Sequence, residues 1–387
     1  MKTLSRIIAG VTPSATLAIT SLAKKMVREG KDVVNFAAGE PDFDTPESIK
    51  QSAITAINNG KTKYTPATGI SELKIEICRK LLHDNELQYT PENIVISCGA
   101  KHNLFNALQA ICNKDDEIII PFPYWVSYPE MVRLAKAKPV IITTKKEDGF
   151  KVNPADLATK ITAKTKAIII NSPSNPSGTV YTKDELKKIG EVAVKNDLYI
   201  ISDEIYEKLI YDNLKHVSIG SLDREIYERT ITVNGVSKAY AMTGWRIGYM
   251  AASKEIAKLA STIQSHSTSN PCTISQYASL KALTLKKDDI DKMRDCFQDR
   301  RDYMLKLLDA IPKISYAVPH GAFYVFCDIS ETKMEAKIFA QKLLQDMHVA
   351  VIPGESFGSG RYIRLSFATD KKNIETGIER LGKWVKR

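Results

Sequence analysis

Two basic side chains lie close together in a segment that is otherwise small, apolar and aromatic. The segment is NGVSKAYAMTGWRIGY, residues 234–249, and the two cations are Lys238 and Arg246. A lysine amine can bond reversibly to an aldehyde, and an arginine guanidinium can hold a phosphate through two parallel hydrogen bonds. The apolar surroundings predict that both side chains point into one cleft, and that the chain turns at Gly244 between them.

Other residues capable of chemistry also follow short apolar runs. Asp203 ends such a run in SDEIYEK, and Tyr206 comes three positions later. Gly99 in SCGAKHN lies before a helical pattern, where free N–H groups can bind an anion. Asn175 lies in the turn NSPSNPSG, and Trp125 lies in PYWVSYPEM. Taken singly, each has a structural explanation such as a helix cap, a turn or core packing.

A repeated pattern between about residues 93 and 252 positions these candidates: a short apolar run, a loop, then an amphipathic segment. Runs that are apolar on both faces are typical of a parallel sheet covered by helices on both sides. We therefore predict an α/β fold with a mostly parallel seven-stranded sheet, in which ligands bind at the carboxyl ends of the strands. The seven runs are NIVISCG, DEIIIPFP, PVIITT, KAIIINSP, LYIISDE, TITVNG and IGYMAAS.

The pattern changes near residue 290. A long amphipathic helix is expected over residues 291–311, followed by the strands AFYVFCDI and YIRLSFA and a basic closing helix. We predict a small α+β domain at residues 291–387 beside a large domain at residues 46–290. Residues 1–45 have no partner pattern in the large sheet, so we expect them to pack with the small domain.

Composition excludes several classes of protein. The chain has 387 residues, 43% hydrophobic and 26% charged, which is typical of a globular protein. It lacks both an apolar run of membrane-spanning length and a signal-peptide pattern, so we expect a cytoplasmic protein with no membrane partner. The net charge is +10, but lysines mostly alternate with acids, so we expect no nucleic-acid partner. The six cysteines lack metal-like spacing, and we expect no metal.

Taken together, the residues at the strand ends offer an anion cradle, a carboxylate, a flat aromatic ring and an amine. The motifs AAGEPDFDTP, KTKYTPATGISELK, PYWVSYPEM, NSPSNPSGTVY, SDEIYEKLIY, SKAYAMTGWRIGY and YIRLSFA carry them. This set resembles the class I (fold-type I) aminotransferases that use pyridoxal 5′-phosphate. The motifs extend from residue 37 to residue 368, and the likeness is strongest to the bacterial aspartate aminotransferase subgroup.

The resemblance implies roles around the cofactor ring. Lys238 would bond to the cofactor's aldehyde and move a proton as general base and then acid. Asp203 would face the ring nitrogen and favour its protonated form. Tyr206 and Asn175 would hydrogen-bond the ring's phenolic oxygen, and Trp125 would stack on the ring.

The resemblance also implies how the cofactor phosphate is held. The N–H groups of Gly99 and Ala100 and the guanidinium of Arg246 would bind it. Tyr64 resembles a tyrosine that reaches the phosphate from a neighbouring subunit. It therefore implies a homodimer with shared active sites.

The substrate side of the site is implied in the same way. Arg364 in YIRLSF resembles the arginine that grips the α-carboxylate of the substrate, aided by the backbone at Gly39. Trp125 and Asn175 would also border the substrate. Lys101, in a helix start, resembles a lysine that receives the second carboxylate of aspartate.

Two hydroxyl residues near the N-terminus, Ser14 and Thr16, match residues that assist at this second carboxylate. The predicted activity is therefore amino transfer between L-aspartate and 2-oxoglutarate, giving oxaloacetate and L-glutamate, by a ping-pong mechanism through lysine-bound pyridoxal phosphate. Relatives that also use prephenate tend to have a lysine where this chain has Thr12, which argues against prephenate. The alternatives are a class I aminotransferase for aromatic, alanine or kynurenine-type substrates, and a non-catalytic cofactor-binding regulator.

Overall fold

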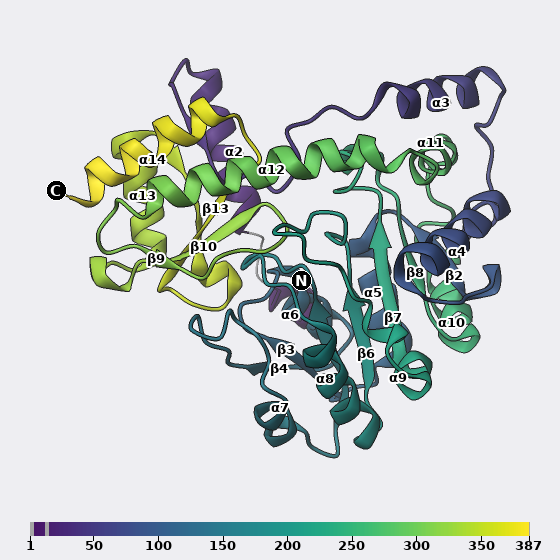
Figure 1. Ribbon diagram of the computed structural model, residues 1–387. Coiled ribbons are helices and arrows are strands. Elements are labelled where there is room, and N and C mark those ends of the chain that lie inside the picture. Colours follow the sequence, from purple (N-terminus) through teal and green to yellow (C-terminus); the bar gives the residue numbers. More distant parts are fainter. Residues whose placement is uncertain (1–3, 12–14, 387) are drawn as a thin grey trace.

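The computed structural model describes residues 4–11 and 15–386, and a seven-stranded sheet forms its centre (Figure 1). The strand order is β2-β8-β7-β6-β5-β3-β4, with β3 to β7 mutually parallel and β8 antiparallel to both neighbours. Each predicted apolar run forms one of these strands, which confirms the α/β fold. The bounds are β2 (Ile94–Ser97), β3 (Glu117–Pro121), β4 (Lys138–Ile142), β5 (Thr165–Asn171), β6 (Tyr199–Asp203), β7 (Thr230–Gly235) and β8 (Gly248–Ala251).

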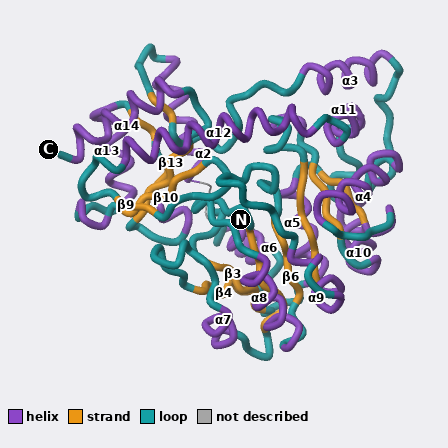
Figure 2. The backbone as a smooth tube through the Cα atoms, viewed as in Figure 1, coloured by secondary structure: helices purple, strands orange, loops and turns teal. Residues whose placement is uncertain are grey.

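Helices cover both faces of this sheet, as the orange strands between purple helices in Figure 2 show. One face packs against α5 (Ala100–Ile111), α6 (Ser127–Leu134) and α10 (Lys254–Ser265). The other packs against α3 (Glu47–Asn58), α4 (Ser71–Asn85), α7 (Pro154–Lys160), α8 (Lys183–Lys195), α9 (Arg224–Arg229) and α11 (Thr273–Leu283). Thr182 caps α8 through a reciprocal pair of hydrogen bonds with Glu185.

A smaller four-stranded sheet has the order β12-β13-β10-β9, and β1 pairs in parallel with β11 beside it. The chain from residue 36 continues over β13, where Phe36 O accepts a hydrogen bond from Ser366 N. The strands are β1 (Val34–Asn35), β9 (Ser315–Tyr316), β10 (Tyr324–Asp328), β11 (Val349–Ala350), β12 (Ile352–Pro353) and β13 (Tyr362–Ser366). The helices are α1 (Arg6–Ala9), α2 (Ala15–Arg28), α12 (Lys287–Leu308), α13 (Ala336–Met347) and α14 (Lys371–Val385).

The loop after β6 connects the two sheets. Tyr206 and Leu209 pack in the same apolar core as Phe323 and Phe339 of the smaller sheet's layer. This packing holds the end of β6 against the second layer, so the carboxyl ends of β5, β6 and β7 face the smaller sheet. Within the residues described, no helix combines the length and the apolar character needed to cross a membrane.

Candidate active site

A cavity of about 390 Å³ opens at the carboxyl ends of β5, β6 and β7. Side chains from both sheets and from the loops between them line it. Lys238 and Arg246, which are eight residues apart in sequence, both line the cavity. The predicted site residues in its lining are Gly39, Ala100, Lys101, Trp125, Asn175, Asp203, Tyr206, Lys238, Arg246 and Arg364.

Asp203 ends β6 and is 4% exposed. Its Oδ2 accepts a hydrogen bond of 2.6 Å from the hydroxyl of Tyr128 in α6. Burial raises the pKa of Asp203 to about 6, although the hydrogen bonds from Tyr128 and from Ile205 N–H act in the opposite direction. An adjacent cation would stabilise the ionised carboxylate of Asp203 and would therefore lower its pKa.

Tyr206 and Asn175 approach the cavity from the loops after β6 and β5. The hydroxyls of Tyr206 and Tyr324 lie 2.9 Å apart. Burial, together with Tyr324, raises the pKa of Tyr206 well above its ordinary value, so its hydroxyl keeps its proton. Asn175 is positioned by Asn171, whose Oδ1 accepts from Asn175 N at 2.8 Å and whose Nδ2 donates to Asp203 O at 2.9 Å.

Lys238 follows β7 and directs its amine into the cavity. Its Nζ donates to Gly39 O at 2.6 Å and lies 5.8 Å from the ring centres of Tyr206 and Phe323. Burial lowers the pKa of Lys238 to about 8, while the charge of Glu40 acts to raise it. A larger share of this amine is therefore neutral near pH 7 than for an ordinary lysine, and a neutral amine is a nucleophile and a base.

Arg246 meets the start of α5. The residues before it form a short turn, Thr243–Trp245, which contains Gly244, but the left-handed backbone conformations occur at Ala241 and at Arg246 itself. Arg246 Nη1 donates to Thr243 O at 2.9 Å, and Nη2 donates to Cys98 O at 3.3 Å. Its guanidinium thus lies beside the first N–H groups of the helix.

Glycine leaves the space for this arrangement. Gly99 has a φ of +91°, and a Cβ there would lie 2.5 Å from Arg246 Nη2. A Cβ on Gly248 would lie 2.2 Å from Ala100 N. Guanidinium and helix N–H groups therefore form one concave surface with the chemistry of a phosphate site.

Arg364, in β13, is 2% exposed. It donates to two neutral acceptors, Asn175 Oδ1 at 3.0 Å and Ala37 O at 3.1 Å, and its guanidinium carbon lies 4.2 Å from the ring centre of Tyr324. Among the residues described, its Nε has no hydrogen-bond partner. A buried guanidinium with an unused donor is suited to bind a carboxylate.

Lys101 and Trp125 form the side of the cavity nearest α5. The Lys101 ammonium lies 4.8 Å from the ring centre of Trp125, and burial together with Arg246 lowers the pKa of Lys101. The Trp125 ring packs edge-on against Tyr128, with ring centres 5.4 Å apart. Lys101 is thus a second cation that a dianionic substrate would meet.

Four predicted residues are absent from the described lining, namely Gly99, Tyr64, Ser14 and Thr16. Tyr64 is 92% exposed and is absent from the described lining of the cavity. Ser14 lies outside the described residues, as does Thr12. Thr16 belongs to α2, but its side chain is not described.

Sequence reasoning missed three residues of the site: Tyr128, Tyr324 and Asn171. Tyr128 is buried and lies three residues after Trp125, within a motif already singled out. Its i, i+3 spacing on the turn into α6 was the available signal. Asn171 likewise lies within a motif already singled out, NSPSNPSG. Tyr324 had no local signal, because a tyrosine in an apolar strand is ordinary.

Residues 31–381 match the family Aminotransferase class I and II, so the chain belongs to this family. It is 47% identical over 381 residues to the aspartate aminotransferase of Bacillus sp. (strain YM-2), covering 97% of both chains. It is 45% identical over 387 residues to the probable aspartate/prephenate aminotransferase of Aquifex aeolicus (strain VF5), covering 99% of this chain and 98% of that one.

The fold is similar to that of solved relatives. The structure of the aspartate aminotransferase from Thermus thermophilus with maleate superposes with a TM-score of 0.96 at 43% identity, covering 99% of this chain and 100% of that chain. The agreement includes both sheets, because the match extends over nearly the whole of each chain.

We expect Lys238 to react with acetic anhydride at a rate that is half-maximal near pH 8. The reason is the lowered pKa: the neutral amine appears as the pH rises through about 8, where less than about 1% of an ordinary lysine is neutral. Competitive labelling followed by peptide mass spectrometry measures it, with the exposed Lys187 as reference. A Lys238 profile that rises only near pH 10 contradicts the assignment.

Proposed function

We propose that this chain is a pyridoxal-phosphate-dependent aspartate aminotransferase. It moves the amino group between L-aspartate and 2-oxoglutarate, giving oxaloacetate and L-glutamate, in two alternating half-reactions. One observation carries the proposal: the amine of Lys238, the carboxyl of Asp203 and the guanidinium of Arg364 converge on a single cavity. Membership of the aminotransferase family supports it.

The residues present fit the cofactor. The concave surface of Gly99, Ala100 and Arg246 would hold its phosphate, and a Cβ on Gly99 would fill that surface. Asp203, with a pKa raised by burial, would be stabilised as an anion by a protonated ring nitrogen. When bound, pyridoxal 5′-phosphate supplies an aldehyde and an electron-accepting ring.

The chain's own groups handle the protons. The Lys238 amine, with a pKa of about 8, can accept a proton from the substrate Cα and release it again near neutral pH. Tyr206 keeps its proton and acts as a hydrogen-bond donor, supported by Tyr324. Trp125 and Tyr128 form an aromatic wall on this side of the cavity.

Two cations support a dicarboxylic substrate. The free Nε of Arg364 suits the α-carboxylate, and Lys101 suits a second carboxylate at the opposite side. The relatives compared are named aspartate or aspartate/prephenate aminotransferases, and one structure contains maleate, itself a dicarboxylate. Because Thr12 lies outside the described residues, the expectation that prephenate is not used remains a prediction.

Homodimeric assembly, a cytoplasmic location and the division into large and small domains belong to the same proposal. Tyr64 is exposed in its own subunit, which supports a role in the active site of a partner subunit. Two-fold assembly is also the commonest oligomeric form.

We expect Lys101→Ala to raise the KM for aspartate by about 10–100-fold, since a hydrogen bond to a charged group is worth about 1.5–3 kcal/mol. The KM for alanine, which lacks the second carboxylate, should not change. A coupled assay of oxaloacetate formation measures the first value.

Lys166→Ala is the matched control, because Lys166 also lies over an aromatic ring, that of Tyr199, but outside the described lining of the cavity. An unchanged aspartate KM in Lys101→Ala would favour another class I specificity. Amino transfer by Lys238→Ala at the wild-type rate would disprove the proposed mechanism itself.

Gly99→Ala should weaken binding of pyridoxal 5′-phosphate by at least about tenfold, because the new methyl group displaces a charge-assisted donor. Absorbance titration of the full-length chain gives the affinity. Gly149→Ala controls for backbone strain, since Gly149 also has a positive φ, +63°, but nothing lies within 4 Å of a Cβ there. Equal losses in the two variants would mean that strain, and not the phosphate surface, is responsible.

A shared active site predicts complementation between two inactive variants. A mixed dimer of Tyr64→Ala and Lys238→Ala chains has one site with both residues intact, so random pairing should leave about a quarter of all sites functional. Co-refolding the two variants and assaying aspartate consumption measures the recovery. If Tyr64 serves its own subunit, mixing restores nothing.

A further inference from the structure

A buried polar cluster lies behind the cavity, on the side of the β6 loop that the proposed reaction does not use. We call it the Glu204 cluster. None of its members belongs to the described lining of the cavity. It consists of Lys80 and Asn85 at the end of α4, Glu204 and Glu207 after β6, and His216 and Ser218 before the turn Ile219–Ser221.

Glu204 is 1% exposed and is surrounded by hydrogen-bond donors. Ser202 Oγ donates to its Oε1 at 2.8 Å, and Ser218 Oγ donates to its Oε2 at 2.6 Å. Asn85 Nδ2 donates to the same Oε2 at 3.1 Å, and His216 Nε2 lies 2.9 Å from it. This set matches the acceptor capacity of a carboxylate and holds it in one direction.

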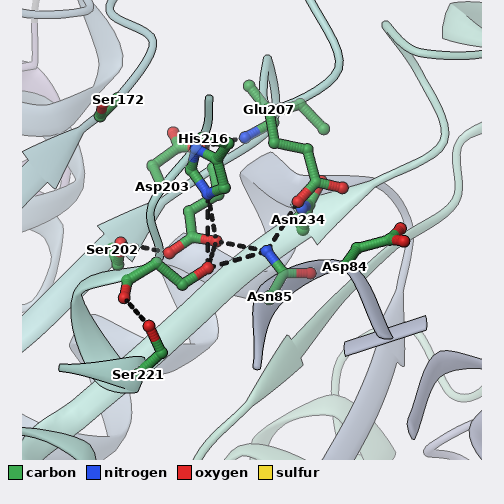
Figure 3. Close-up of polar contacts among 12 residues, drawn as sticks. Asp84, Asn85, Ser172, Ser202, Asp203, Glu207, His216, Ser221 and Asn234 are labelled. Atoms are coloured by element: carbon green, nitrogen blue, oxygen red, sulfur yellow. Dashed lines mark hydrogen bonds and ion pairs between the residues drawn. The ribbon is translucent and has the colours of Figure 1, made fainter. Parts of the chain in front are cut away.

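Asn85, Glu207 and His216 point toward a common centre (Figure 3). Ligand atoms of Glu204, Glu207 and His216 lie within 4.8 Å of one another, a spacing that a metal ion could use. Here other side chains of the protein compensate the negative charge of Glu207. Asn85 Nδ2 donates to Glu207 Oε2 at 2.8 Å, and Lys80 forms an ion pair with Glu207. Although burial acts to raise the pKa of Glu207, the neighbouring cations outweigh it and lower the pKa to about 2.

The cluster and the cavity share one short segment, residues 203–207. Asp203 and Tyr206 face the cavity, whereas Glu204 and Glu207 face the cluster. Glu204 N donates to Val233 O of β7 at 2.9 Å. The segment is therefore held on one side by the Glu204 carboxylate and on the other by the hydrogen bond from Tyr128 to Asp203.

We propose that Glu204 is a positioning residue for Asp203: its buried carboxylate fixes the segment that carries Asp203 and adds a second negative charge behind it. The inference rests on the proposed function for the role of Asp203. A buried charge is screened little by solvent, so its field reaches the neighbouring carboxyl. That field raises the proton affinity of Asp203 and favours a positively charged ring nitrogen opposite it.

Titration of Asp203 in the full-length chain tests this inference. The ¹³C carboxyl resonance of Asp203 is assigned by its absence in Asp203→Asn. Glu204→Gln should lower the midpoint by about one pH unit, because a like charge is removed. The titratable groups that act on Asp203 are Tyr128, Tyr206, Lys238 and Glu204. Tyr128→Phe should shift the midpoint upward because it removes a donor.

Ser202→Ala is the matched control, since it removes a hydrogen bond to Glu204 but keeps the charge. Its midpoint should stay at the wild-type value. If Glu204→Gln does not fold, the double variant Glu204→Gln with Asn85→Ser replaces the Asn85 donor by a hydroxyl that can accept from the new amide. It also removes the charge and should produce the same downward shift.

Different results would overturn the role of Glu204 and the proposed function. An unchanged midpoint in folded Glu204→Gln, or in the double variant, overturns the inference and leaves the proposed function intact. A downward shift of equal size in Ser202→Ala also overturns it, because packing and not charge would then be the cause. Amino transfer from aspartate by Asp203→Asn at the wild-type rate overturns the proposed function instead.

Discussion

Burial of the Arg364 guanidinium is energetically unfavourable, and the rest of the site must compensate it. A buried charge is costly unless a partner compensates it, and the hydrogen-bond acceptors of Arg364 are the neutral oxygens of Asn175 and Ala37. The rings of Tyr324 and Phe357 lie 4.2 and 5.2 Å from its guanidinium carbon and hold it in place. A carboxylate that enters the cavity would supply the missing negative charge. The unfavourable burial of the Arg364 guanidinium therefore favours binding of an anionic ligand.

The same burial acts on two titratable groups of the cavity, Asp203 and Lys238. Burial raises the pKa of Asp203 to about 6 and lowers that of Lys238 to about 8, so both pKa values shift toward neutral pH. Parallel strands bring these residues together, because the carboxyl ends of β6 and β7 lie at the same edge of the sheet. The position of the strand ends thus brings two groups with pKa values near neutral pH into one cavity.

Much of the architecture was predictable from local sequence. Continuous apolar runs specify strands covered on both faces, and Thr182 with Glu185 specifies the start of a helix. The network around the site was less accessible. Tyr128 reaches Asp203 across 75 residues, and Tyr324 reaches Tyr206 across 118, and neither pair leaves a pattern in its own neighbourhood.

The sequence by itself determined which elements form and which chemical groups follow them, because periodicity and turn residues act over a few positions. Tertiary structure decided the rest. Packing placed the left-handed conformations at Ala241 and Arg246, although Gly244 was the residue best able to adopt one. Packing also turned Asp203 toward the cavity and Glu204 away from it, since only contacts with other elements distinguish two adjacent carboxylates.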